Sequence, residues 1–196
     1  MKTKLILSLL GIIMLLNSGK VVAQNPYGTD ELLKAKSYHS MEEALKTPNK
    51  VHILDIPFSK LTAVPDGINQ FTYLQILSLY KNEITELPKD ITDLGNLMVL
   101  WMPFNKLTTL PSQIEYLKEM RFMRLDWNEI KSLPSEIGKL ENLAGLSLRG
   151  NKLQTLPAEI GYLKKLDYLD LRDNNISASE QSKIAKLLPA TKILFK

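Results

Sequence analysis

A repeat of 23 residues, which begins at Val51 and continues without insertion, constrains the fold of this chain more than any other feature. Five complete units, and a sixth that diverges toward its end, share the pattern LxxLxLxxNxLxxLPxxIxxLxx. Self-similarity at so short a period predicts a solenoid, because each unit can bury its apolar face only against its neighbours. The units are 51–73, 74–96, 97–119, 120–142, 143–165 and 166–188.

Seven positions of the unit (1, 4, 6, 11, 14, 18 and 21) are predicted to point inward. In the five complete units, all 35 of these positions hold an aliphatic residue, Met or Phe. The alternation at positions 4 and 6 is the period of a strand with one buried face, and the later spacing favours a helical or 3-10 turn. A proline precedes position 18 by three residues, and we expect it at the first helical position, where its missing amide would have no partner. These prolines are Pro65, Pro88, Pro111, Pro134 and Pro157.

Position 9 of the unit is asparagine in every repeat but the first, which has Ser59. A buried asparagine can satisfy backbone N–H and C=O groups where the chain turns away from a strand. We interpret the column as a structural ladder between units and not as a ligand site. Its members are Asn82, Asn105, Asn128, Asn151 and Asn174.

The repeat pattern resembles the leucine-rich repeat family, in particular the 23-residue LPxxIxxL type found in secreted proteins of spirochaete bacteria. The resemblance covers residues 51 to about 188. It implies an α/β fold, a right-handed horseshoe-shaped solenoid. In such a solenoid a parallel sheet lines the concave side, and short helical or 3-10 segments form the convex side.

Both ends of a solenoid expose apolar surface and need a cap. The Ser-x-x-Glu spacing of a capping box occurs at 40–43 and predicts a helix that runs to about Thr47. The same spacing at 177–180 predicts a second helix through Leu188. Residues 189–196 are expected to add a last strand that closes the core.

The first 23 residues have the features of a signal peptide. Lys2 and Lys4 precede an apolar run of 12 residues, and a polar stretch and Val-Val-Ala follow. The run is short for a membrane span, which takes roughly 20 apolar residues. An uncleaved membrane anchor is the alternative. We therefore expect export to the periplasm, the cell surface or the medium, with residues 24–50 forming an N-terminal segment and capping helix.

Composition excludes several classes of function. Without the leader the formal charge falls from +4 to +1, and no basic stripe remains to predict binding to nucleic acid or anionic lipid. The chain has no cysteine, and only His39 and His52 could supply imidazole to a metal. GxSxG, HExxH and phosphate-loop motifs are missing from the sequence. We expect a protein that is not an enzyme and that has no catalytic residues, metal or cofactor.

Positions 3, 5, 7 and 8 are expected to face outward from the concave sheet, where large apolar groups are informative. Both tryptophans of the chain fall there, and Trp101 and Trp127 are expected to form one patch with Phe104 and Phe122. An aromatic centre bordered by arginine is the composition of a protein-binding hot spot. The candidate partner-binding residues are Phe58, Tyr80, Trp101, Phe104, Phe122, Arg124, Asp126, Trp127, Arg149, Tyr168 and Arg172.

These features predict an exported, monomeric binding module with a protein ligand outside the cell, and the resemblance adds host proteins to the candidate targets. A carbohydrate stacked on the aromatic faces is one alternative. A second is self-packing of the rings, since aromatic residues favour strands for their own sake. A third is a structural or self-assembling envelope protein, in which the strand edge at 193–195 pairs with another copy. No stable membrane insertion is expected after cleavage of the signal peptide.

Overall fold

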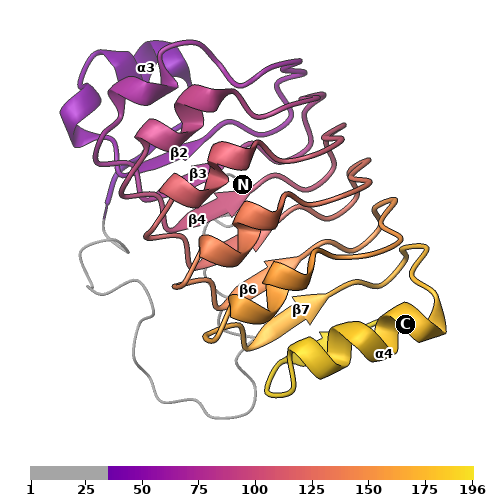
Figure 1. The fold of residues 1–196 in the computed structure, drawn as a ribbon. Coiled ribbons are helices and arrows are strands. Elements are labelled where there is room, and N and C mark those ends of the chain that lie inside the picture. The colour runs from indigo at the N-terminus through magenta and orange to yellow at the C-terminus, as the bar shows by residue number, and fades with distance from the viewer. Residues whose placement is uncertain (1–34) are drawn as a thin grey trace. The chain divides into compact units, whose positions relative to one another are not determined.

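The computed structural model describes residues 35–196, which form one parallel sheet with short helices on the opposite side (Figure 1). Within these residues the sheet has eight strands, and their spatial order is their order along the chain. The strands are β1 (Ser37–Tyr38), β2 (Ile53–Asp55), β3 (Ile76–Ser78), β4 (Val99–Trp101), β5 (Phe122–Arg124), β6 (Gly145–Ser147), β7 (Tyr168–Asp170) and β8 (Lys192–Leu194).

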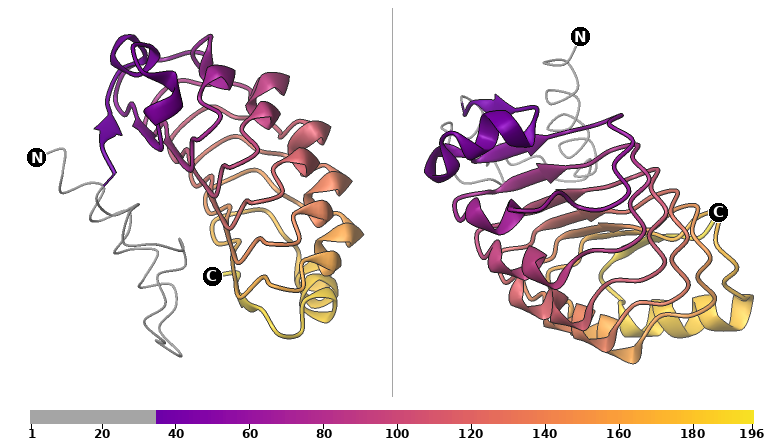
Figure 2. Two further views of the ribbon diagram at one scale, coloured as in Figure 1. Left: turned by 90° about the vertical axis from the view of Figure 1, so that its left-hand side faces the viewer. Right: turned by 90° about the horizontal axis from the view of Figure 1, so that it is seen from above.

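The strand register follows the sequence repeat. Ile53 lies opposite Ile76, and Ile76 lies opposite Val99, so each step across these strands advances the chain by 23 residues. The chain therefore completes one coil per repeat. Figure 2 shows the coils stacked side by side, with the strands along one side and the helical segments along the other. The predicted fold class, a solenoid with a parallel concave sheet and short 3-10 segments, is confirmed.

The side opposite the sheet consists of 3-10 helices. Four of their N-cap residues are prolines with φ between −68° and −63° and an extended ψ between 147° and 155°. These prolines thus stand one residue before the first helical position, whereas the sequence had predicted them at that position. The reason is that the chain is still extended at the proline and turns into the helix only after it. The helices are η2 (Ile68–Gln70), η3 (Lys89–Asp93), η4 (Ser112–Tyr116), η5 (Ser135–Lys139) and η6 (Ala158–Tyr162).

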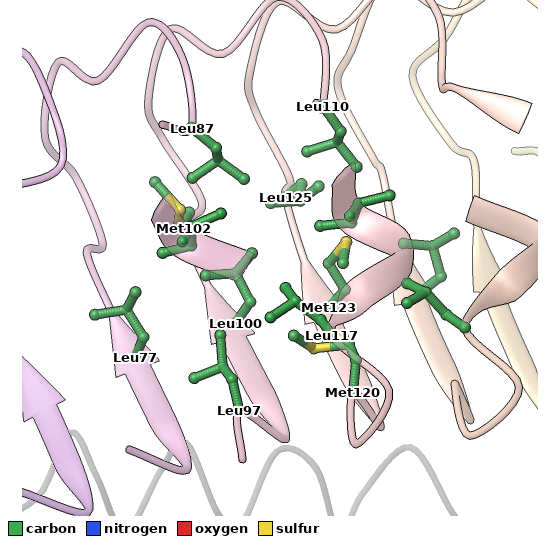
Figure 3. Close-up of a cluster of buried hydrophobic side chains, with 14 of the residues drawn as sticks. Leu77, Leu87, Leu97, Leu100, Met102, Leu110, Leu117, Met120, Met123 and Leu125 are labelled. Carbon is green, nitrogen blue, oxygen red and sulfur yellow. The ribbon is translucent and has the colours of Figure 1, made fainter. Parts of the chain in front are cut away.

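The apolar positions of the repeat form one continuous core between the sheet and the 3-10 helices. Leu77, Leu100 and Met123 occupy position 4 of successive repeats and lie next to one another along the solenoid (Figure 3). The isoleucines at position 18 are fully buried from Ile91 to Ile160. Burial of one such side chain contributes about 1.5–3 kcal/mol. Each repeat therefore adds a similar set of buried side chains to a core that runs along the whole solenoid.

The asparagine at position 9 joins the backbones of adjacent repeats. Asn128 Nδ2 donates to the carbonyl oxygens of Met102 in the preceding repeat and Leu125 in its own, both at 3.0 Å. Its Oδ1 accepts from the amide of Leu107 at 3.0 Å. Each side chain thus satisfies backbone groups that the turn after the strand would leave without partners. Equivalent bonds are made by Asn82, Asn105, Asn151 and Asn174.

The N-terminal end is closed by more structure than the sequence predicted. Helix α3 (Met41–Leu45) starts at the predicted capping residue, because Ser40 Oγ accepts from the amide of Glu43 at 3.2 Å. The helix ends before the predicted Thr47, and a 3-10 helix, η1 (Pro48–Lys50), follows it. Strand β1, which was not predicted, pairs with β2 and extends the sheet beyond the first repeat.

The C-terminal end is covered by helix α4 (Ala178–Leu187), drawn in yellow in Figure 1. Ser177 Oγ accepts from the amide of Glu180 at 3.3 Å, as the capping-box spacing predicted. Ile184 is buried in the core, and β8 then pairs with β7 inside the predicted last strand. No helix in residues 35–196 is long and apolar enough to cross a membrane. The predicted signal peptide, residues 1–23, lies outside the described residues.

Replacement of one ladder asparagine tests its structural role. We expect Asn128→Ala to lower the free energy of unfolding by about 3 kcal/mol, because it leaves several buried backbone groups without partners. Urea unfolding followed by far-ultraviolet circular dichroism measures the change. The matched control is Asn175→Ala, since Asn175 is exposed, and it should shift stability by less than about 0.5 kcal/mol. Equal unfolding midpoints for the two variants would contradict the structural role.

Candidate functional site

The backbone at position 8 of the repeat is left-handed in all six units, with φ between 53° and 68°. Glycine takes this conformation freely and aspartate tolerates it, but a bulky residue does so at a cost of about 1–2 kcal/mol. The first, third and fourth repeats nevertheless carry aromatic residues here. The turn itself therefore does not favour these rings. The six residues are Phe58, Lys81, Phe104, Trp127, Gly150 and Asp173.

Four aromatic side chains form a continuous row where the strands end, which we call the aromatic ladder: Phe58, Tyr80, Phe104 and Trp127. In the second repeat the ring comes from Tyr80 at position 7, because position 8 is not aromatic there. The centroid of the Tyr80 ring lies 5.2 Å from that of Phe58 and 5.7 Å from that of Phe104. Phe58, Phe104 and Trp127 are 57%, 45% and 43% exposed. Rings at these separations attract each other by about 0.5–1.5 kcal/mol per pair beyond their burial. This attraction offsets part of the backbone strain.

The rings of the aromatic ladder pack on one another and on the next repeat. Phe104 and Trp127 are stacked, with centroids 6.1 Å apart and planes 14° from parallel. On the side of the next repeat, Gly150 lies so close to the Trp127 ring that a Cβ on it would come within 2.4 Å of Cε3. Arg149 Cζ also lies 5.5 Å from the Trp127 centroid. Groups of the preceding and of the next repeat thus lie against the indole ring, which remains 43% exposed.

A second group of side chains lies on the concave face over β4 to β6. Trp101 is only 8% exposed, and Arg124 Cζ lies 4.6 Å from its ring centroid, within cation–π range. Arg124 Nε donates to Asp126, and Asp126 also accepts from Ser147 Oγ and from the backbone amide of Arg149. The Asp126 carboxylate is buried beneath the arginine and is held by three donors.

A related pairing of a buried aspartate with an arginine occurs at the end of β7. Asp170 accepts from the Tyr168 hydroxyl at 3.0 Å and from Arg172 Nη2 at 2.6 Å. Burial raises the pKa of Tyr168 to about 12, and the Asp170 charge and hydrogen bond add to the effect. Burial alone would raise the pKa of Asp170, but the hydrogen bonds from Arg172 and Tyr168 outweigh it and hold that pKa below its ordinary value. The hydrogen bond to Asp170 raises the pKa of Arg172. Asp170 and Arg172 are therefore a charged pair at neutral pH.

The structure corrects the predicted geometry of the patch. Trp127 and Phe104 stand in the aromatic ladder, whereas Trp101 is buried under Arg124 and does not share an exposed centre with them. Phe122 lies half-buried against Gly145, whose missing side chain makes room for the ring. Tyr168 and Asp126, predicted on the outward face, are also buried. The cause is pairing between repeats, which covers outward positions with neighbouring side chains.

Sequence reasoning missed residues that complete the site. Asp170 and Asp173 anchor Arg172 and Arg149, yet neither stands among the predicted site residues. A signal was present, since opposite charges two residues apart in an extended chain share a face, as in Asp170 at the end of β7 and Arg172 just after it. Among residues 35–196, no group of three or more histidine, aspartate or glutamate side chains could hold a metal ion.

Known proteins place the chain in a family. A model described as "Leucine-rich repeat region" matches residues 112–188. The solved structure of a leucine-rich repeat protein from Leptospira interrogans matches with a TM-score of 0.68 and 35% identity, over 82% of this chain and 46% of that one. This chain is a leucine-rich repeat protein. The predicted resemblance to spirochaete proteins of this family is confirmed.

A second bacterial structure has a fold similar to that of this leucine-rich repeat protein. An internalin of Listeria monocytogenes has a TM-score of 0.58 and 19% identity, over 74% of this chain and 39% of that one. The chain thus spans less than half the length of either solved structure. No curated protein matches the sequence.

Tyr168 makes stability depend on alkaline pH. Its folded-state pKa of about 12 lies above the ordinary 10.0, so its contribution is complete below pH 10 and is lost as the pH rises through 12. We expect Tyr168→Phe to remove this part of the decline, measured as the free energy of unfolding at stepped pH. The control is Tyr162→Phe, because Tyr162 is exposed and its loss should leave the decline unchanged. If both variants follow the unmodified protein, neither the burial of Tyr168 nor its pairing with Asp170 makes stability depend on pH.

Proposed function

We propose that this leucine-rich repeat protein is an exported, non-catalytic module that binds a protein outside the cell, host proteins included. Solenoids of this kind offer an extended concave surface, which commonly serves protein–protein interaction. The observation that carries the proposal is the aromatic ladder, in which three exposed rings, those of Phe58, Phe104 and Trp127, stand where the backbone does not favour them.

The fifth and sixth repeats support the view that the ladder serves binding and not folding. Gly150 and Asp173 occupy position 8 of the fifth and sixth units, and the turn keeps the same left-handed backbone there. Aromatic residues are therefore not needed to form the coil. Exposed rings that strain the backbone of a scaffold able to do without them are typical of a binding surface, where strain is retained for function.

The orientation of the rings favours a protein ligand over a carbohydrate. A sugar stacks on an open aromatic face, but Phe104 is stacked beside Trp127, and Gly150 and Arg149 of the next repeat lie against the same ring. The partly exposed rings suit apolar side chains that pack between them. Aromatic anchors bordered by arginine are also the composition of protein-binding hot spots.

Export is supported by the sequence at the start of the chain. Lys2 and Lys4 followed by an apolar run and then small residues are typical of a signal peptide. An extracellular location fits a surface that has exposed aromatic rings and no net charge large enough to select nucleic acid.

The experiment removes the ladder without changing the turn. We expect Phe104→Asn with Trp127→Asn to keep the unfolding midpoint within a few degrees, because asparagine tolerates the left-handed backbone and offsets the lost ring packing. The same variant should lose capture of surface proteins that the unmodified protein retains from biotinylated host cells and from bacterial envelope. Capture is measured by cross-linking and mass spectrometry, followed by titration calorimetry with each purified candidate.

The matched control replaces two other exposed aromatic residues, Tyr116→Asn with Tyr162→Asn, on the convex helices. It should bind like the unmodified protein. Equal capture by all three proteins would contradict a ligand role for the ladder. Binding to a glycan array that only the ladder variant loses would replace the protein ligand by a carbohydrate. Unfolding of the ladder variant would show that the rings are structural.

A further inference from the structure

Three arginines lie on the concave side of the fourth, fifth and sixth repeats, beside and beyond the last ring of the aromatic ladder: Arg124, Arg149 and Arg172. Each side chain is only partly exposed and is paired with an aspartate. Arg149 lies over the last ring of the ladder, Trp127, so the arginine row adjoins the end of the ladder. A ligand that lies along the solenoid would meet the rings of the first repeats and then the guanidinium groups.

The arginines are fixed in orientation before any ligand arrives. Arg124 is held by its Nε bond to Asp126 and by the Trp101 ring beneath its guanidinium group. Arg149 Nε donates to Asp173 at 2.7 Å, and its guanidinium group lies near the Trp127 ring. A planar guanidinium held at one edge loses little further freedom when its other edge binds.

At Arg124 and Arg172 a partner meets the positive group more than the negative one, whereas Asp173, the partner of Arg149, is itself exposed. The side chains of Asp126 and Asp170 are each only 4% exposed and lie beneath Arg124 and Arg172. Both carboxylates also accept hydrogen bonds from a neighbouring hydroxyl group. Their charges therefore hold the arginines in place without presenting oxygen atoms to a ligand.

The outer edges of two guanidinium groups remain open. Within residues 35–196, the hydrogen bonds of Arg124 and Arg149 use Nε alone. The Nη1 and Nη2 groups of each form the fork that binds a carboxylate through two parallel hydrogen bonds. The two positions are one strand spacing and two residues apart, roughly 8 Å, close to the roughly 7 Å between alternate residues of an extended chain.

We infer that the protein partner presents an acidic segment whose carboxylates pair with the open forks of Arg124 and Arg149. Apolar side chains that precede the acidic residues would pack on the exposed rings of the aromatic ladder. The inference rests on the proposed function and names the chemistry of the partner at that same surface.

The test uses two labelled peptides of ten residues, each with an apolar first half rich in leucine and phenylalanine. One has glutamate in its second half, and the other has glutamine. Fluorescence anisotropy with the full-length protein measures both affinities at low and moderate salt. We expect the glutamate peptide to bind at least about tenfold tighter at low salt, as paired charge-assisted hydrogen bonds imply. Moderate salt should reduce the preference.

Variants of the arginines distinguish the effect of the guanidinium fork from the effect of its positive charge. Arg149→Gln should reduce the preference several-fold and keep the fold, because its partner Asp173 is exposed. Arg124→Gln combined with Asp126→Asn removes the second fork without leaving a buried charge unpaired. Arg149→Lys keeps the charge but not the fork and should behave like Arg149→Gln. The control is Lys152→Gln, which changes the net charge equally in the same repeat but removes a lysine paired with Glu129, and it should keep the preference.

Several results would overturn the inference. These are equal affinity for the two peptides, full binding by Arg149→Lys, or an equal loss in Lys152→Gln. Tighter binding of a phosphoserine peptide than of the glutamate peptide would also overturn it, in favour of a phosphate ligand. The Phe104→Asn and Trp127→Asn double variant should weaken both peptides alike. Loss of the glutamate preference alone therefore leaves the proposed function standing, whereas failure of the ladder variant to weaken either peptide counts against the proposed function.

Discussion

The hydrogen bonds that asparagine side chains make between neighbouring coils are the interaction on which the rest of this structure depends. At the end of each strand the backbone must turn sharply, and its N–H and C=O groups lose the partners they had in the sheet. Asn105, for example, donates to carbonyls of two successive repeats and accepts from the amide of Ile84. Because unsatisfied buried backbone groups are costly, the turn is stable only when another coil lies beside it.

The backbone at the residue before position 9 is also the same in every repeat. Position 8 is left-handed in every repeat, whatever residue occupies it. The scaffold thus places one side chain per coil at the same edge of the sheet, at the spacing of the strands. When Phe104 and Trp127 occupy such positions, the rings are brought into contact by the backbone and not by their own attraction. A surface of regular spacing therefore follows from the repeat, and its chemistry can change without loss of the coil.

On the concave face, the burial of aspartate side chains determines how the arginine side chains are oriented. A buried carboxylate is costly unless several donors surround it, and Asp126 has donors from three residues in two repeats. The compensating groups include Arg124, which is held over the Trp101 ring as a result. Desolvation of the aspartate therefore sets the orientation of the arginine. A rigid guanidinium group suits recognition, because little side-chain entropy is left to lose on binding.

The sequence by itself determined the fold of this protein. The period set the strand register, the apolar positions set the core, and the capping spacings at Ser40 and Ser177 located the ends, because all of these depend on neighbours at fixed distances along the chain. The extra strand β1 was not predicted, since two residues are too few to show the alternation of apolar and polar residues that marks a strand. Only the tertiary structure decided which outward side chains stay accessible. Trp101 and Trp127 occupy similar outward positions in the sequence pattern, yet one is buried under an arginine and the other is exposed in the ladder. The reason is that exposure on this face depends on the size and charge of side chains one coil away, which strand periodicity does not encode.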